Sequence, residues 1–496
     1  MTFLHIFTFL LCVIAYIWYR VRKILSYWSD RNVPVIKPSF PLGNLGEVGK
    51  KHLGTVIKDI YLKLKDKSDF AGFYYLMTPQ IIPLSLDLMK NILIKDFQYF
   101  PDRKIYYNEK DDPLSAHLFA IRGEKWRAWR QQLTPTFTSG KMKMMFPIVI
   151  SQAKNLQNYI EKNMNRGPME FKHVCVRYTA DVIGSAAFGL DCRALFEEDT
   201  EIIHVGKLFF AFNTFIERFK FFFGMICENF SRKLGLRFNH PDLEEFFMRI
   251  IKDTIDKRDA GLIDRNDFMK HLLEIRDSGK GNNLTFNELA AQAFVIFFGG
   301  FETSSNTMEW CLCLLALHPE IQDRARDEIR EVMEKWNGEL SYEAVQELTY
   351  LRQCIDETLR LYPPATVLFR LCVQDYKVPN SDFIIEKGTQ IFVPSMGIHM
   401  DPEIYPEPEV FDPERFTPEN IKDRHPMAYI PFGAGPRNCI GLRFAYMQMT
   451  VGLAYILHNF RLTLNPKTKV PLEIDPEHIV VSPNGSSWLD VEKIIS

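Results

Sequence analysis

The chain has 496 residues, 46% of them hydrophobic and 25% charged, a composition typical of a folded globular protein and not of a disordered one. Its 60 basic and 62 acidic residues give a formal net charge of −2, so the charge balance does not indicate a nucleic-acid partner. No Ser/Gly-rich linker, low-complexity segment or internal repeat divides the chain after its N-terminus. We therefore expect one large domain behind the N-terminal segments.

The N-terminus carries an apolar run from Phe3 to Tyr19, followed by Arg20, Arg22 and Lys23. The run is close to the minimum length for a membrane-spanning helix. A cleaved signal peptide would place its positive residues before the run and a small-x-small site after it, and this segment has neither feature. Because basic flanks stay on the cytoplasmic side, we predict a transmembrane anchor over residues 1–28 and a cytoplasmic body.

A proline-rich segment follows the anchor. Pro34, Pro38, Pro41 and Gly43 exclude a regular helix and favour a stiff, extended connector. We predict a hinge over residues 29–45 and a catalytic body over residues 46–496, which is tethered to the membrane rather than embedded in it.

The body shows mostly helical periodicity, with four short segments typical of strands at residues 71–77, 80–86, 382–385 and 390–394. The last two are expected to form a hairpin across the turn at residues 386–388. The predicted fold class is mainly α with small β-sheets. A long proline-rich meander over residues 401–419 precedes the C-terminal helix, and long ordered loops usually serve a site.

One long helix is predicted between Thr285 and His318. Thr285 and Glu288 fit a capping box, and His318-Pro319 marks the end. Pro319 cannot continue the helix because it lacks the backbone N–H that the ladder requires.

Two glycines, Gly299 and Gly300, occupy the middle of that helix and cost roughly 2 kcal/mol together relative to alanine. Either close helix packing or a flat ligand on bare backbone, with Glu302 and Thr303 beside it, would compensate. Taken alone, the pair favours helix packing.

Two further helices carry polar pairs on one face. Glu357 and Arg360 lie three residues apart, and we consider both a surface ion pair and a buried pair that holds Arg415 of the meander. Trp126 and Arg130 lie four apart and offer an indole N–H and a guanidinium to an anion, although the pair by itself favours an amphipathic helix with an edge tryptophan.

Nine cysteines are scattered along the chain without a CxxC pair, which argues against a disulfide framework and a zinc ribbon. Eight of them are expected to be buried apolar thiols. The ninth, Cys439, differs because "PFGAGPRNCIG" at residues 431–441 places it among glycines, directly before a predicted helix.

Together these motifs resemble the cytochrome P-450 family of haem-thiolate monooxygenases, in family order and over nearly the whole chain. The haem-binding signature F-x-x-G-x-R-x-C-x-G corresponds to Phe432, Gly435, Arg437, Cys439 and Gly441. The E-x-x-R pair of the family corresponds to Glu357 and Arg360, and the PERF arginine to Arg415. The oxygen-activating helix motif corresponds to residues 299–303, and the W-x-x-x-R pair to Trp126 and Arg130. The details resemble the microsomal animal branch, nearest the insect detoxification enzymes, although Gly299 stands where relatives more often have alanine.

The resemblance implies haem b as cofactor, with Cys439 as the metal ligand that supplies an axial thiolate to the iron. Glycines 433, 435 and 441 would permit a tight turn in which backbone N–H groups hold the sulfur. The residues expected to contact the haem or its propionates are Arg437, Trp126, Arg130, Arg370, Phe432, Gly433, Gly300 and, as a weaker candidate, His117.

The family activity implies that Thr303 and Glu302 deliver protons while one oxygen atom of O2 enters a lipophilic substrate. The chain has no GxGxxG fingerprint, so electrons are expected from an NADPH-dependent cytochrome P-450 reductase, with cytochrome b5 as an optional second donor, at the endoplasmic reticulum membrane. Basic residues expected to dock the reductase, if they are not simply solvated surface, are Lys125, Arg127, Lys141 and Lys143.

Three alternatives stay open at this point. A haem sensor or transport protein would need the cysteine without the Glu302-Thr303 pair, and a peroxide-rearranging enzyme would need no external reductase. A cysteine hydrolase would use Cys439 with His399 or His425 as the base.

The substrate is indicated only in class. Between residues 207 and 224, phenylalanines recur at helical spacing at positions Phe212, Phe215, Phe219 and Phe223. This pattern is typical of a core helix or of an apolar entrance to a site. With Phe119, Phe298 and residues 365–369, they favour an apolar, aromatic-compatible substrate.

Overall fold

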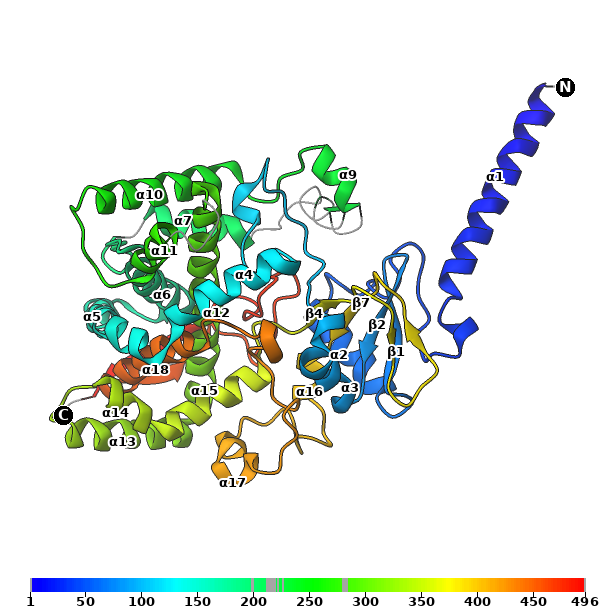
Figure 1. Ribbon diagram of the computed structural model, residues 1–496. Coiled ribbons are helices and arrows are strands. Elements are labelled where there is room, and N and C mark those ends of the chain that lie inside the picture. The colour runs from blue at the N-terminus through cyan, green and yellow to red at the C-terminus, as the bar shows by residue number, and fades with distance from the viewer. Residues whose placement is uncertain are drawn as a thin grey trace. The chain divides into compact units, whose positions relative to one another are not determined.

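The computed structural model describes residues 2–197, 200–210, 220, 223–224, 227–278 and 284–494. The chain divides into two compact units, each assembled from segments that are distant in sequence (Figure 1). The first unit contains residues 1–102, 366–408 and 425–437, and the second contains residues 103–365, 409–424 and 438–496.

The first unit is built on a four-stranded sheet with the order β1-β2-β7-β4. β1 (Phe70–Tyr75) pairs antiparallel with β2 (Thr78–Pro83). β7 (Gln390–Val393) pairs parallel with β2 and antiparallel with β4 (Leu368–Leu371). β1 and β7 are buried along their whole length, as expected for central or covered strands, and the strands predicted at residues 71–77, 80–86 and 390–394 are confirmed.

The predicted hairpin between residues 382–385 and 390–394 is wrong. β6 (Ile384–Ile385) pairs instead with the preceding β5 (Tyr376–Lys377) in a separate two-stranded sheet. The turn that joins them contains Asn380 at φ +58°, a left-handed conformation that asparagine tolerates well. The connection at residues 386–388 therefore leads from one sheet to another.

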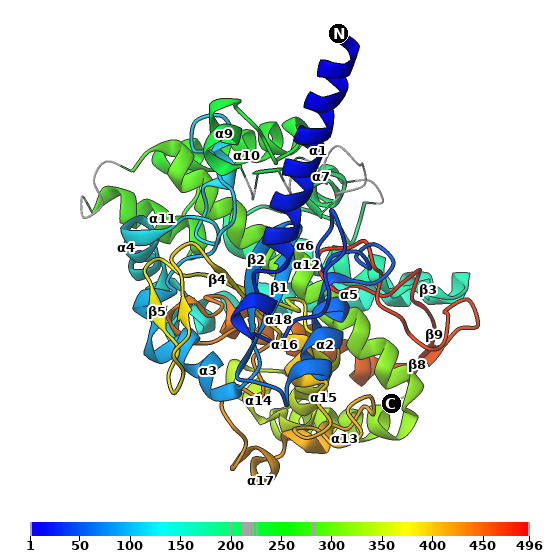
Figure 2. The same cartoon turned by 90° about the vertical axis from the view of Figure 1, so that its right-hand side faces the viewer.

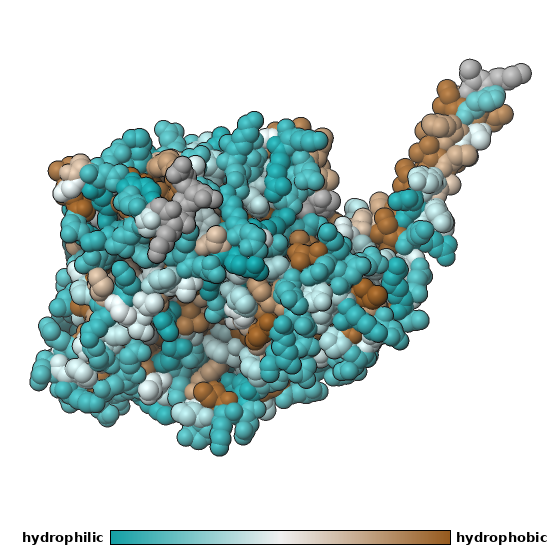
Figure 3. Space-filling model, viewed as in Figure 1, coloured by the Kyte–Doolittle hydropathy of each residue, from teal (hydrophilic) through white to brown (hydrophobic). Residues whose placement is uncertain are grey.

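The N-terminal helix α1 (Thr2–Leu25) is long and apolar enough to cross a membrane, and its residues from Phe3 onward are not buried. Figure 3 shows the apolar surface along this helix. Its last turn is fixed to the sheet, because the Tyr74 hydroxyl donates to the carbonyl groups of Ile24 (3.0 Å) and Leu25 (2.9 Å). The following Trp28 is 1% exposed and packs on Gly72, where a Cβ would lie 2.3 Å from the indole.

The remaining elements of the first unit are short helices around the sheet. They are η1 (Ser29–Arg31), α2 (Leu53–Leu64), α3 (Leu86–Lys90), the π-turn η2 (Asn91–Lys95), η3 (Phe97–Tyr99), α16 (Ser395–His399) and η8 (Gly435–Arg437).

The second unit is helical and is organised around α12 (Phe286–Leu317). The capping box at Thr285 and the end before His318 are confirmed. α12 is buried along most of its length and packs against α6 (Phe171–Phe188) and α18 (Leu442–Asn459). A three-stranded sheet, β3 (Met169–Glu170), β9 (Trp488–Lys493) and β8 (Phe460–Leu464), completes this unit (Figure 2).

The other helices of the second unit surround this core. They are η4 (Pro113–Ser115), α4 (Gly123–Leu133), η5 (Thr134–Phe137), α5 (Ser139–Asn163), η6 (Met164–Arg166), α7 (Glu201–Phe210), α9 (Glu228–Lys233), α10 (Pro241–Asp259), α11 (Phe268–Asp277), α13 (Pro319–Lys335), α14 (Tyr342–Glu347), α15 (Thr349–Leu361), η7 (Pro413–Phe416) and α17 (Pro418–Ile421).

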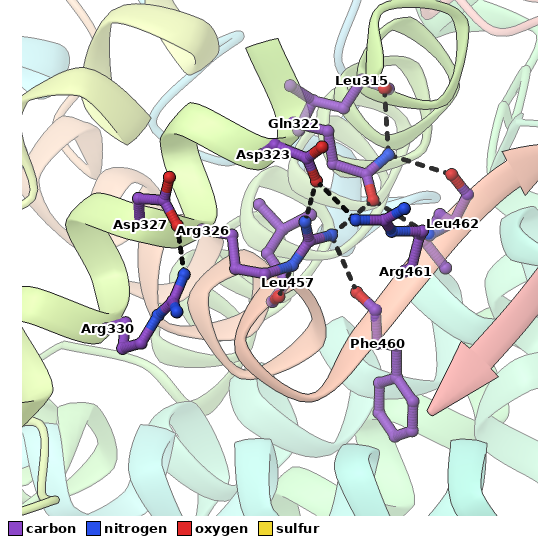
Figure 4. Close-up of polar contacts among 10 residues, drawn as sticks. All are labelled: Leu315, Gln322, Asp323, Arg326, Asp327, Arg330, Leu457, Phe460, Arg461 and Leu462. Atoms are coloured by element: carbon purple, nitrogen blue, oxygen red, sulfur yellow. Dashed lines mark hydrogen bonds and ion pairs between the residues drawn. The ribbon is translucent and has the colours of Figure 1, made fainter. Parts of the chain in front are cut away.

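Buried polar side chains of α13 join α12, α18 and β8 (Figure 4). Gln322 Nε2 donates to the carbonyl groups of Leu315 (3.0 Å) and Leu462 (2.9 Å), and its Oε1 accepts from Leu462 N (2.9 Å). Arg326 Nε donates to the carbonyl of Leu457 at 2.9 Å. Arg326 therefore satisfies one of the carbonyl groups in the last turn of α18.

The prediction of eight buried cysteines is only partly right. Five of them are buried: Cys175, Cys311, Cys313, Cys354 and Cys372. Cys192 and Cys227 are half-buried, and Cys12 is exposed because it lies on α1.

Candidate functional site

The turn before Cys439 requires glycine at two places. Gly433 and Gly435 both have φ +72°, a left-handed conformation that other residues adopt only with strain. A Cβ on Gly435 would also lie 1.9 Å from the carbonyl oxygen of Leu93. Gly441 differs from the prediction, because its φ of −88° is open to any residue and it serves as the N-cap of α18.

The Cys439 side chain is exposed to solvent. Neighbouring protein atoms nevertheless desolvate the sulfur, and this desolvation raises the pKa of the thiol. Three groups oppose this rise: the backbone N–H of Gly441, and the positive charges of Arg130 and Arg103. The N-terminus of α18 follows directly and also favours negative charge. Every one of these groups stabilises a thiolate, and the contribution of Arg103 could not be read from the sequence.

The helix predicted over residues 123–133 is α4, and it fixes Arg130 beside the cysteine. Arg130 Nη1 donates to the Asn438 carbonyl at 2.8 Å, and its Nη2 donates to Asn438 Oδ1 at 2.7 Å. Trp126, one turn earlier, is 4% exposed. Asn438 therefore positions Arg130, a role that no sequence pattern indicated.

Arg370 and Arg437 are a buried pair of cations in the first unit, 1% and 2% exposed. Arg437 Nε donates to the Pro101 carbonyl (2.6 Å) and its Nη2 to Asp102 Oδ1 (3.2 Å). Arg370 Nη1 donates to the Phe369 carbonyl at 2.8 Å, whereas its buried Nε has no hydrogen-bond partner among the residues described. Burial and the neighbouring Arg437 lower the pKa of Arg370 to about 9.

These residues fit a haem. A buried guanidinium with an unpartnered N–H, held next to a second guanidinium, is stabilised by an anion. The carboxylates of haem b are such anions, and a cysteine thiolate is a ligand that would suit its iron. Taken unit by unit, Arg370 and Arg437 of the first unit suit an anion, and Cys439 and Arg130 of the second unit suit a metal and an anion.

The two glycines of α12 have different surroundings. A Cβ on Gly300 would lie 2.7 Å from Cδ1 of Ile183 on α6, so helix packing explains this glycine. A Cβ on Gly299 would meet nothing within 4 Å among the residues described. Helix packing therefore accounts for Gly300 but not for Gly299. Gly299 is the position that leaves space beside the helix, as the alternative of a ligand on bare backbone requires.

Glu302 and Thr303 follow these glycines. Thr303 Oγ1 donates to the Gly299 carbonyl at 2.6 Å, which fixes the hydroxyl on the helix surface. Glu302 is 8% exposed, and burial raises its pKa against the opposing effects of Lys172 and Asn306. Glu302 therefore holds a proton more readily than an ordinary carboxyl group.

Gln448 of α18 is a connecting residue that the sequence analysis missed. Its Nε2 donates to the Gly300 carbonyl (2.9 Å) and to Ser304 Oγ (2.5 Å). It links the helix after Cys439 to the helix of Thr303. An amide side chain in the mostly apolar stretch "FAYMQMTVG" is the signal that could have drawn attention to it.

His117 and Phe432 are the remaining predicted haem contacts. His117 is half-buried, its Nδ1 has no hydrogen-bond partner among the described residues, and desolvation lowers its pKa to about 4. It is therefore neutral at physiological pH. Phe432 is half-buried in the first unit, just before the turn.

Glu357, Arg360 and Arg415 form a buried cluster, and the alternative of a surface ion pair is wrong. Arg360 Nε and Nη2 each donate to a different carboxylate oxygen of Glu357 at 2.7 Å, and both side chains are 0% exposed. Arg415 Nε lies 3.5 Å from Glu357 Oε1, and the backbone N–H of Asp412 donates to the same oxygen at 3.0 Å. The pair thus holds the meander against α15.

Several basic residues considered for docking already have acidic partners within the chain. Lys125 Nζ lies 3.0 Å from Glu109 and 3.1 Å from Glu288. Arg127 is paired with Glu124, and Lys143 with Glu343. Docking through these residues stays a prediction, as it does for Lys141.

The histidines considered as hydrolase bases have other tasks. His399 Nε2 accepts the backbone N–H of Ile430 at 3.0 Å. His425 Nδ1 accepts the backbone N–H of Met427 at 3.1 Å, and its Nε2 lies 3.6 Å from Asp87. These contacts explain both residues structurally.

The predicted site residues are shared between the two units. The first unit contributes Arg370, Phe432, Gly433 and Arg437. The second unit contributes His117, Trp126, Arg130, Gly300, Glu302, Thr303 and Cys439. The predicted phenylalanines at positions 212, 215 and 219 lie outside the described residues.

Comparison with known proteins agrees with this donor set. Residues 34–489 match the family model for cytochrome P450. The chain is 42% identical over 493 residues to probable cytochrome P450 6a14 of Drosophila melanogaster, covering 95% of this chain and 96% of the relative. It is 41% identical over 489 residues to cytochrome P450 6A1 of Musca domestica, covering 96% and 95% of the two chains. The chain therefore belongs to the cytochrome P450 family, the haem-thiolate monooxygenases, and its cofactor is haem.

Proposed function

We propose that this monooxygenase takes electrons from a membrane-bound NADPH-dependent cytochrome P-450 reductase, with cytochrome b5 as an optional donor, and oxidises lipophilic small molecules. The observation that carries the assignment of the site is the surroundings of Cys439, where a backbone N–H and two arginines all favour a thiolate. The insect origin of the relatives favours a role in the metabolism of foreign compounds.

In this proposal Cys439 ligates the iron, while Arg130, Arg370 and Arg437 bind the propionates. Trp126 and His117 supply further polar contacts, and Phe432, Gly433 and Gly300 supply apolar and backbone contacts. The haem, when bound, supplies the oxygen chemistry.

The chain's own contribution to that chemistry is proton handling. Thr303 Oγ1, held by the Gly299 carbonyl at 2.6 Å, keeps its lone pairs available to a bound water or oxygen. The buried carboxyl group of Glu302 is the proton source behind it, because its pKa is raised.

We further propose that residues 1–28 anchor the protein in the endoplasmic reticulum membrane, with residues 29–45 as a hinge and residues 46–496 in the cytoplasm. The exposed apolar helix α1 and its basic end at Arg22 and Lys23 support this arrangement. A reductase in the same membrane would meet the catalytic domain without a soluble carrier.

The substrate is proposed to be apolar. Phe119 is 47% exposed and carries Arg103 over its ring at 4.1 Å, so it presents an apolar and cationic surface. Phe298, by contrast, is 2% exposed and stacks on Phe209 at 4.0 Å between centroids. Phe298 is therefore part of the core, and the proposed substrate class depends on Phe119 and on residues 365–369.

The decisive experiment replaces Cys439 by serine in the full chain. The reduced, CO-bound protein should show the strongly red-shifted Soret band of a thiolate-ligated haem, and Cys439→Ser should lose it together with product formation. Cys12→Ser, at an exposed cysteine on α1, is the matched control and should keep both. Retention of the band in Cys439→Ser would assign the ligand to another cysteine.

The reductase and substrate parts are tested separately. The chain is reconstituted with NADPH–cytochrome P-450 reductase and lipophilic compounds under isotopically labelled O2, and the products are analysed by mass spectrometry. One labelled oxygen per product molecule, only with NADPH and reductase present, is the expected result. Equal turnover without the reductase would favour the peroxide-rearranging alternative.

A further inference from the structure

A row of buried polar groups continues along α12 beyond Glu302. Asn306 and Glu309 lie four and seven residues further on, so all three side chains share one face of the helix. Their exposed fractions are 8% for Glu302, 1% for Asn306 and 0% for Glu309. Burying such groups is costly unless each finds a hydrogen-bond partner.

Several atoms of this row lack such a partner among the residues described. They include both amide atoms of Asn306 and both carboxylate oxygens of Glu309. The Ser487 hydroxyl lies near enough to Glu309 for a long hydrogen bond, which opposes the rise in the Glu309 pKa. Asn306 lies similarly close to Glu302. Buried polar groups with only long contacts to one another, and with hydrogen-bonding capacity left over, are the usual setting of internal water.

A charge at the surface of the second unit acts on this row. The charge of Lys172, half-buried at the start of α6, acts on both Glu302 and Glu309. The same charge acts on His478, whose side chain is 37% exposed. Lys172 is therefore the charged group whose field both carboxyl groups and the more exposed His478 share.

We propose that Glu309 is a proton-relay residue that receives protons from the Lys172–His478 surface and passes them, through water held by Asn306, to the carboxyl group of Glu302. The inference rests on the proposed function, in which Glu302 supplies protons to the reaction. The relay would replace the protons that Glu302 gives up, which the Glu302-Thr303 pair alone cannot do.

The proton balance follows from the overall reaction. Substrate, O2, two electrons and two protons give hydroxylated product and one water molecule. The electrons come from the reductase and the protons from solvent. Each proton that leaves Glu302 is replaced by the proton of Glu309, which is then reprotonated from the surface, so neither carboxyl group changes over a cycle.

The protonation equilibrium of Glu309 suits this role. Burial raises its pKa to about 7, with the negative charges of Glu302 and Glu170 adding to the rise and Lys172 and Ser487 opposing it. The other titratable groups that face it are thiols, Cys175 on α6 and Cys313 on α12. A group with a pKa near the working pH accepts and releases a proton with similar ease.

The first test observes the proton directly. Infrared difference spectra of the haem-loaded full chain, recorded in H2O and D2O between about pH 5 and pH 9, report the C=O stretch of a protonated carboxyl group. We expect a band that exchanges with deuterium and titrates near neutral pH, that is absent from Glu309→Gln and that persists in Glu309→Asp. A spectrum unchanged in Glu309→Gln would overturn the proposal.

The second test follows the use of the proton. In Glu309→Gln, the fraction of NADPH electrons recovered in product should fall roughly tenfold and lose its pH dependence, less than the hundredfold or more that a direct acid contributes. Glu309→Asp should restore most of it. An organic hydroperoxide replaces O2, NADPH and reductase together, so hydroperoxide-driven oxidation should be the same in Glu309→Gln and wild type.

The outcomes separate the two proposals. Equal loss of the NADPH-driven and hydroperoxide-driven reactions would reduce Glu309 to a structural residue and overturn the relay. Failure of wild type to oxidise any compound would count against the proposed function, while the infrared titration of Glu309 would be unaffected.

Discussion

Replacing Glu357 by alanine should destabilise the protein strongly, because Arg360 would remain buried without a carboxylate. The carboxylate accepts two hydrogen bonds from Arg360 at 2.7 Å and one from Asp412 N at 3.0 Å, with both side chains 0% exposed. Removing one partner of a buried ion pair costs about 3–5 kcal/mol. The matched control is Asp327→Ala, which breaks an ion pair with Arg330 whose side chains are 60% and 54% exposed, and should cost less than about 1 kcal/mol.

Urea unfolding followed by far-UV circular dichroism measures the difference between these variants. A double variant, Glu357→Leu with Arg360→Met, tests the cause, since it removes both charges and keeps apolar volume. It should be more stable than Glu357→Ala alone. The reasoning fails if Glu357→Ala costs no more than Asp327→Ala, or if the double variant is the least stable of the set.

Three other outcomes are expected. Gly299→Ala should raise stability by roughly 0.5–1 kcal/mol in the same urea assay, because its Cβ meets no described atom, whereas Gly300→Ala should gain nothing from the added helix propensity. The pKa of His117 is about 4 in the folded chain against 6.5 ordinarily, so the folded state binds fewer protons than the unfolded state. The free energy of unfolding should therefore fall by roughly 3 kcal/mol as the pH drops from 6.5 to 4. His117→Gln should abolish that fall. Deletion of residues 2–20 should release the protein from membranes with haem retained. A longer deletion that also removes Trp28, which is 1% exposed, should lower the urea midpoint of unfolding. Haem loss in the shorter deletion would contradict a separable anchor.

Local patterns predicted the elements whose ends are encoded in adjacent residues. The capping box at Thr285 and the stop at Pro319 located α12, and the spacing of Glu357 and Arg360 located their ion pair. The hairpin at residues 382–394 failed because strand partners are chosen by tertiary packing, and β7 finds better-buried partners in β2 and β4.

The site was predicted as a list of residues but not as an environment. Cys439 stands out in its motif, whereas the neighbours that act on it or on its helix come from elsewhere in the second unit. Arg103 and Gln448 have no sequence feature that links them to a cysteine, and only folding brings them near. Asn306 and Glu309 were visible at helical spacing from Glu302, yet their burial depends on α6 and on the segment before β9.

The discontinuity of both units has a consequence for biosynthesis. The sheet of the first unit cannot close until β4 and β7, some 300 residues after β1, leave the ribosome. The second unit waits longer still, because β9 lies between β3 and β8 and ends at Lys493. While α1 can already insert into a membrane, the rest of the chain emerges without its final partners and with apolar surface uncovered. Completion of the fold, and with it stable uptake of haem, must therefore await the emergence of β9 from the ribosome.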